Sequence, residues 1–128
     1  MRPDIMTHIF DEHATNTAIK LDNFERYVRR QQLARFMARY ELFKKIINIK
    51  GSIIECGVHH GGGLLAWGKM SAALEPYGLH RKVIGFDTFE GFPTIHEHDT
   101  GGKENTELVE KGFSAHTDTY AELADCVK

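Results

Sequence analysis

A carboxylate followed by a run of glycines stands near the middle of the chain. Glu55 and Gly57 end a short apolar segment, and three consecutive glycines follow at 61–63. Glycine permits sharp turns and close approach of a ligand, and amides at the start of a helix can bind an anion. The pattern therefore predicts a binding turn for a negative group, here the carboxylate of an amino-acid moiety. A strand-to-helix turn without a ligand is the alternative.

A second carboxylate, Asp87, closes the next apolar segment. An acid at the end of a strand can accept hydrogen bonds from the two hydroxyls of a ribose. Asp87 lies further from Glu55 than the roughly 20 residues of the dinucleotide fingerprint. The extra length can be absorbed by the helix between them and the connector 75–81. The alternative is that Asp87 starts a turn before Thr88.

Two familiar phosphate-binding patterns are incomplete. Gly63, Gly68 and Lys69 match most of a P-loop, but Met70 stands where that loop needs Ser or Thr to ligate magnesium. The pattern Gly-x-Gly-x-x-Gly is absent as well, because His59 replaces its second glycine. These departures argue against an NTPase and weaken a nicotinamide or flavin interpretation.

Histidines occur at two places that could bind a ligand. His59 and His60 lie in the glycine turn, where either contacts a cofactor or simply caps the turn. The run 96–99, His-Glu-His-Asp, carries potential metal ligands. Adjacent loop residues rarely converge on one ion, so we interpret this run as a solvated polar loop and expect no metal site in it.

The elements that position these residues are typical of an α/β protein. The segment 52–58 is apolar without alternation, which predicts a parallel strand buried on both faces. Helical spacing predicts a helix over 64–74, and 82–87 predicts a second strand. Together these form a βαβ cofactor-binding unit over 52–87 with a right-handed crossover. The carboxyl ends of both strands then lie at one rim of the sheet.

The flanking segments are less regular. We expect an irregular leader over 1–21 and a long helix over 22–50. A lid-like loop is expected over 88–116, because so long a weakly structured stretch suits an active-site lid. Thr119 and Glu122 form a capping-box pattern, which predicts the start of a helix over 117–128.

Only two strands are predicted in the 128 residues, whereas a two-stranded sheet is marginal alone. We therefore expect a truncated domain spanning 22–128, or a core completed by another copy of the chain. The hydrophobic content of 41% is ordinary for a soluble protein, and the net charge of −2 gives no long-range attraction to nucleic acid or to an anionic membrane. No apolar run reaches the ~18 residues that span a bilayer. Two isolated cysteines indicate reduced thiols, and we expect a cytoplasmic homo-oligomer with a small-molecule substrate.

The combined motifs resemble the macrocin O-methyltransferase family. The segments that carry the resemblance are Tyr40-Glu41-Leu42-Phe43, Ile54-Glu55-Cys56-Gly57-Val58-His59-His60-Gly61-Gly62 and Gly85-Phe86-Asp87-Thr88-Phe89-Glu90-Gly91-Phe92-Pro93. The resemblance runs through most of 30–128. It implies a Rossmann-like class I methyltransferase sheet, preceded here by a long helix. It also implies methyl transfer from S-adenosylmethionine to a hydroxyl, often on a sugar of a natural product, with a divalent metal such as magnesium.

Matched position by position, Glu55, Gly57 and Gly61 fall on the family's glycine-rich cofactor motif, and Thr88, Phe89 and Glu90 fall on the loop that flanks the cofactor. With His59 of the glycine turn, the predicted cofactor-binding residues are Glu55, Gly57, His59, Gly61, Asp87, Thr88 and Phe89. Asp87 takes the place of the ribose-binding acid. The family's metal-binding aspartates and catalytic base fall after Lys128, so the chain as given has no assigned catalytic or metal-binding residue. Two alternatives stay open: another α/β enzyme with a nucleotide cofactor, such as a dehydrogenase, or a non-catalytic interaction protein of the same fold.

Overall fold

The computed structural model describes residues 5–77, 81–92, 94–96 and 118–127. The chain divides into two compact units, Met1–Leu42 and Phe43–Lys128, which are described separately. In the part of the chain that is described, no helix is both long enough and apolar enough to cross a bilayer.

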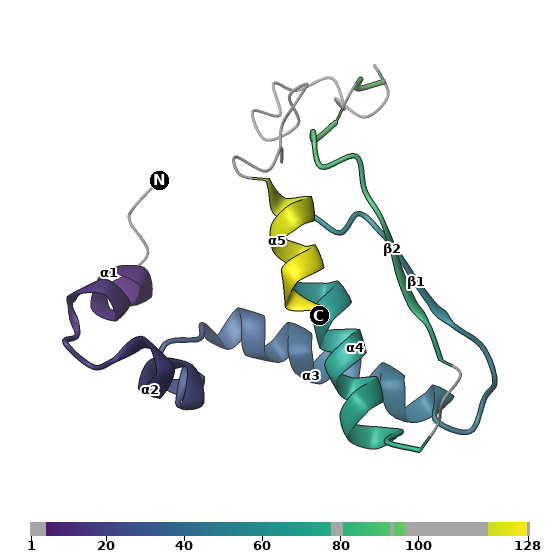
Figure 1. Ribbon diagram of the computed structural model, residues 1–128, viewed down its shortest axis with the longest axis horizontal. Coiled ribbons are helices and arrows are strands. Elements are labelled where there is room, and N and C mark those ends of the chain that lie inside the picture. The colour runs from purple at the N-terminus through teal and green to yellow at the C-terminus, as the bar shows by residue number, and fades with distance from the viewer. Residues whose placement is uncertain (1–4, 78–80, 93, 97–117, 128) are drawn as a thin grey trace. The chain divides into compact units, whose positions relative to one another are not determined.

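The first unit is helical (Figure 1). It contains α1 (Ile5–Glu12), α2 (Thr17–Asp22), the short 3-10 helix η1 (Phe24–Arg26) and the start of α3 (Arg30–Ile46). The ring of Phe10 in α1 meets the ring of Tyr27 edge-on, with centroids 5.0 Å apart. Lys20 of α2 is buried beside them, and its ammonium group lies over the Phe10 ring and donates to the Phe10 carbonyl. An aromatic and cationic cluster therefore joins α1, α2 and η1.

Two predictions for this region are wrong. The leader 1–21 is not irregular over its described part, because α1 and α2 occupy most of it. The helix predicted over 22–50 is shorter and begins at Arg30. Asn23 accounts for the break: its backbone and side-chain amides both donate to the Ile19 carbonyl, which ends α2. Asparagine competes in this way with continuing helical hydrogen bonds.

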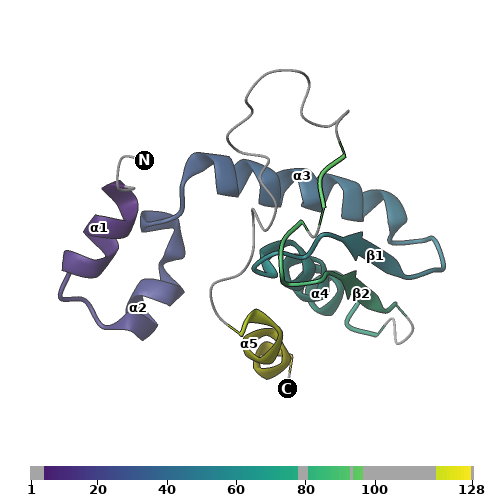
Figure 2. The same ribbon diagram turned by 90° about the horizontal axis from the view of Figure 1, so that it is seen from above.

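The second unit contains the predicted strand, turn, helix and strand. Strand β1 (Ile53–Cys56) leads through a glycine turn into α4 (Gly62–Leu74), and β2 (Val83–Phe86) follows. The two strands are parallel neighbours, with Ile53 opposite Val83 and Cys56 opposite Phe86. Figures 1 and 2 show α4 running alongside both strands.

The core of this unit lies beneath α4. Phe43 is fully buried, and its ring stacks near Trp67 of α4 with centroids 6.4 Å apart. The opposite face of the sheet is open, since Ile54 is 62% and Phe86 60% exposed. The prediction that the first strand is buried on both faces is therefore wrong. The unbroken apolar run places apolar side chains on both faces of the strand, but α4 covers only one of these faces.

A last helix, α5 (Thr119–Cys126), packs against the glycine turn before α4. Its N-cap is Asp118, whose carboxylate accepts from the Ala121 amide at 3.1 Å. The helix is found where it was predicted, but the predicted cap at Thr119 is one residue late. Most of the predicted lid, from 97 onward, lies outside the described residues.

Candidate cofactor site

The two strands end side by side. The Gly57 amide donates to the Phe86 carbonyl at 2.9 Å, which continues the parallel ladder one residue beyond β1. Gly57 therefore lies beside Asp87, the first residue after β2. In open α/β sheets, ligands bind just outside the carboxyl ends of the strands. This rim is therefore the candidate ligand-binding site of the chain.

Asp87 joins the loops that follow the two strands. One carboxylate oxygen accepts from the His59 amide at 2.7 Å, and the other accepts from the Phe89 amide at 2.8 Å. The His59 hydrogen bond, assisted by that of Phe89, holds the pKa of Asp87 below its usual value, while partial burial acts in the opposite direction. Asp87 is therefore anionic at neutral pH. An ionised carboxylate has about four acceptor positions. The His59 and Phe89 amides occupy two of them, and the Val58 and Thr88 amides also lower the pKa of Asp87.

The turn between β1 and α4 requires unusual backbone angles. Gly57, His59 and Gly61 have φ values of +86°, +52° and +81°. Such angles are easy for glycine and uncommon for histidine. His59 adopts its angle while its amide points at Asp87. A Cβ atom on Gly57 would meet nothing within 4 Å, so open space adjoins the backbone at the rim.

A cavity of about 240 Å³ opens at this rim. It is lined by Gly57, His59, Asp87, Gly91 and Phe92. The structure thus brings together three of the predicted cofactor residues. Gly91 and Phe92 were not predicted as site residues, although both belong to the third segment of the resemblance, 85–93. Gly91 has a φ of +79°, and a turn glycine after a strand was the signal that could have identified it.

Glu55 lies one step back from the rim. It pairs with Gly85 in the ladder, and strand alternation places it on the same face as Asp87. Among the described residues around the cavity, Glu55 is not a lining residue. Contact between Glu55 and a cofactor stays a prediction.

The other predicted cofactor residues have structural partners of their own. Gly61 is buried, and a Cβ atom there would overlap the Leu123 side chain of α5. The Thr88 hydroxyl donates to the Gly91 carbonyl at 3.0 Å and closes the turn. The Phe89 ring meets Tyr120 of α5 edge-on, with centroids 6.0 Å apart. These residues shape the loops around the cavity, and direct cofactor contact by them stays a prediction.

The rings of His59 and His60 meet edge-on with centroids 4.0 Å apart, and both residues are exposed. Within the described ranges, no group of three or more His, Cys, Asp or Glu side chains could hold a metal ion. His96 is exposed, while the rest of the run 96–99 lies outside the described residues. The described residues therefore do not fit a metal centre, and no chemical step is assigned to a metal ion.

The residues of this site lie within a match to a known protein family. The family model for macrocin-O-methyltransferase (TylF) matches residues 16–117, which include both strands, the glycine turn and Asp87. The chain belongs to this family. The predicted resemblance is thereby confirmed. No curated protein sequence matches the chain.

Two solved structures of one enzyme are similar to this family member. The crystal structure of CalS11, a calicheamicin methyltransferase, aligns with a TM-score of 0.83 and 26% identity over 94% of this chain and 46% of that chain. An apo structure of CalS11, described as a TDP-rhamnose 3'-O-methyltransferase of calicheamicin biosynthesis, aligns with a TM-score of 0.61 and 28% identity over 66% of this chain and 37% of that chain. The α/β methyltransferase fold is confirmed. The chain spans about half the length of CalS11.

Proposed function

We propose that the chain is the S-adenosylmethionine-binding part of an O-methyltransferase that acts on a hydroxyl of a sugar or sugar-bearing natural product. The proposal rests on the Asp87 carboxylate at the shared rim of β1 and β2, beside the open backbone of Gly57. Family membership and the likeness to CalS11, a sugar O-methyltransferase by its description, support the same activity.

The residues at the rim suit the two polar parts of this cofactor. Asp87 is anionic and half-buried, and its carboxylate oxygens are acceptors of the kind that suits the two ribose hydroxyls. The first amides of α4 lie directly after the turn, where the positive end of the helix dipole suits the carboxylate of the methionine moiety. Gly57 leaves room for the ligand between these two points.

S-adenosylmethionine supplies an electrophilic methyl group when it is bound. The role proposed for this chain is to hold and orient that donor. His59 fixes the Asp87 carboxylate through its amide, and Phe92 adds an apolar wall to the cavity. Alignment of donor and acceptor is a large part of the rate enhancement in such transfers. A family metal, the catalytic base, a homo-oligomeric state and a cytoplasmic location stay predictions.

Calorimetric titration with S-adenosylhomocysteine tests the proposal, because this product keeps the ribose and the amino-acid carboxylate. We expect saturable binding of S-adenosylhomocysteine and no binding of NAD. Preferential binding of NAD would support the dehydrogenase alternative. A folded chain that binds neither nucleotide would support the non-catalytic alternative and contradict the proposal.

A further inference from the structure

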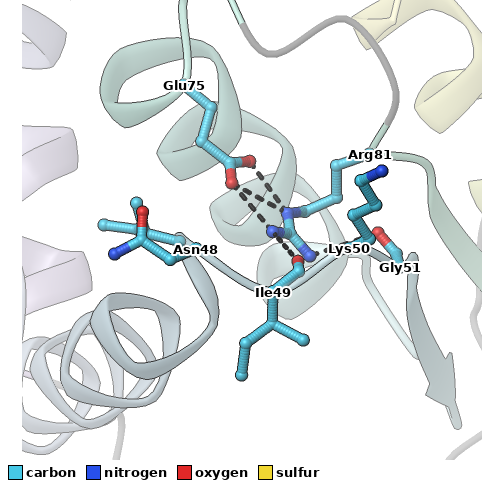
Figure 3. Close-up of a pocket in the computed structure, with 7 residues that line it drawn as sticks. Asn48, Ile49, Lys50, Gly51, Glu75 and Arg81 are labelled. Carbon is cyan, nitrogen blue, oxygen red and sulfur yellow. Dashed lines mark hydrogen bonds and ion pairs between the residues drawn. The ribbon is translucent and has the colours of Figure 1, made fainter.

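An arginine with a largely covered side chain joins the amino ends of the two strands. Arg81 lies just before β2, and its guanidinium donates to three backbone carbonyls, two in the connector between α3 and β1 (Figure 3) and one at the end of α3. The distances are 2.8 Å to Ile46, 2.9 Å to Ile49 and 3.2 Å to Gly51. Ile46 ends α3, and its carbonyl also accepts from the Ile49 amide at 2.9 Å, so Arg81 is a second donor to a carbonyl at the end of the helix.

Glu75, at the end of α4, holds the guanidinium from the other side (Figure 3). Arg81 Nε donates to one carboxylate oxygen at 2.8 Å, and Nη2 donates to the other at 2.8 Å. Ser71 adds a hydrogen bond to Glu75 at 3.1 Å. The side chains of Arg81 and Glu75 are only 8% and 9% exposed. This is the bidentate geometry that gives an arginine–carboxylate pair its directional strength.

The pair lies where the register of the sheet begins. The residue after Arg81 is Lys82, whose carbonyl accepts the first ladder bond, from Ile53 at 2.8 Å. Each strand has four residues, so few ladder bonds resist a slip. A slip of one residue turns every side chain to the other face of a strand. It would take the Asp87 carboxylate away from the His59 amide at the far end.

We propose that Arg81 and Glu75 are positioning residues for the rim: their pairing fixes β2 against β1 and thereby holds Asp87 beside His59. The pair acts through the strands and does not touch the cavity at the carboxyl end, whose walls come from other residues. The link from the rim to cofactor binding rests on the function proposed above. The link from Arg81 to the hydrogen bonds of Asp87 is independent of that function.

Amide NMR on the full chain tests the positioning role. Arg81→Met removes every hydrogen bond of the guanidinium, and Arg35→Met removes an exposed arginine of α3 as the matched control. We expect Arg81→Met to speed hydrogen exchange at the His59 and Phe89 amides at least tenfold more than at core amides of α4, an estimate on the order of local-opening effects. Both amides should also lose the chemical shifts of carboxylate-bound donors. The control should change neither.

A merely structural role would accelerate exchange across the whole unit alike, so the selective change is the signature. If Arg81→Met does not fold, Arg81→Lys decides by the same measurement, because lysine keeps the charge but not the planar fork. Unchanged exchange rates and chemical shifts of the His59 and Phe89 amides in a folded variant would overturn the proposal. So would an equal acceleration at all amides of the unit.

Calorimetry with S-adenosylhomocysteine separates this inference from the proposed function. If the native chain binds the ligand, Arg81→Met should bind it at least about tenfold more weakly, and Arg35→Met should bind it normally. Unchanged affinity in Arg81→Met would overturn the link to the cofactor. If the native chain itself does not bind, the proposed function fails, while the amide measurements still decide the role of Arg81.

Discussion

The His59 amide donates to the Asp87 carboxylate at 2.7 Å across 28 residues of sequence. This bond joins the turn after β1 to the loop after β2, and it fixes an anion at the rim of the sheet. The same carboxylate also accepts from Phe89 in its own loop. One side chain thus holds both loops and, in the proposed function, presents acceptors to the ribose.

Replacing Asp87 should weaken cofactor binding. We expect Asp87→Ala to lower the affinity for S-adenosylhomocysteine by tenfold or more, since hydrogen bonds to charged groups contribute roughly 1.5–3 kcal/mol. Isothermal calorimetry measures the change. Asp11→Ala, which removes an exposed aspartate of α1, is the matched control and should bind normally. Equal affinities for Asp87→Ala and the native chain would remove Asp87 from the site.

The same carboxylate should make stability depend on pH. The pKa of Asp87 is lowered in the folded chain, chiefly by the His59 amide, so the ionised form favours folding. Its contribution is present above the unfolded pKa of about 3.9 and is lost as the pH falls through the lower folded pKa. Denaturant unfolding of the native chain and of Asp87→Asn should therefore differ at pH 6. The difference should shrink as the pH approaches 3. A constant difference would contradict this account.

Much of this rim could be predicted because its signals are local. Unbroken apolar runs marked both strands, and the places of Gly57 and Asp87 follow from their positions just after the strand ends. Direct contact between Asp87 and the His59 amide could not be predicted, because a peptide amide carries no mark in the sequence. The break before α3 was missed because Asn23 ends a helix only through a specific hydrogen bond to Ile19.

The packing of α5 was also beyond the sequence. The sequence marks Gly61 as a turn glycine, yet a Cβ atom added there would meet the side chain of Leu123, far along the chain. The sequence did not indicate the contacts of Arg81 either, because a charged residue in a connector is ordinarily solvated. Its acceptors are backbone carbonyls of a turn that only the folded chain brings near.

Gly61 should not tolerate a side chain. Gly61→Ala places a Cβ atom against Leu123 at a φ of +81°, a conformation that disfavours alanine by about 1–2 kcal/mol. We expect a loss of roughly 1–3 kcal/mol in the free energy of unfolding. Adding Leu123→Ala should recover the steric part but not the backbone part. Denaturant titration of the four combinations measures both, and strict additivity of the two changes would contradict direct contact between these residues.

Gly85 is expected to be sensitive for a different reason. Its Cβ position lies 2.6 Å from Val58 and 2.9 Å from Leu64, within the interface between β2 and α4. Gly85→Ala should therefore overpack this interface and lower the free energy of unfolding by about 1–3 kcal/mol. Gly68→Ala is the matched control, because a Cβ atom there meets nothing within 4 Å. A Gly85→Ala variant as stable as the native chain would show that Val58 gives way without cost.

The most direct test is an amide NMR titration of the chain with S-adenosylhomocysteine. The account predicts saturable shifts that concentrate at Gly57, His59, Asp87, Gly91 and Phe92, the residues that line the rim cavity. Saturating ligand that leaves these amides unmoved, or that shifts residues elsewhere in their place, would contradict it.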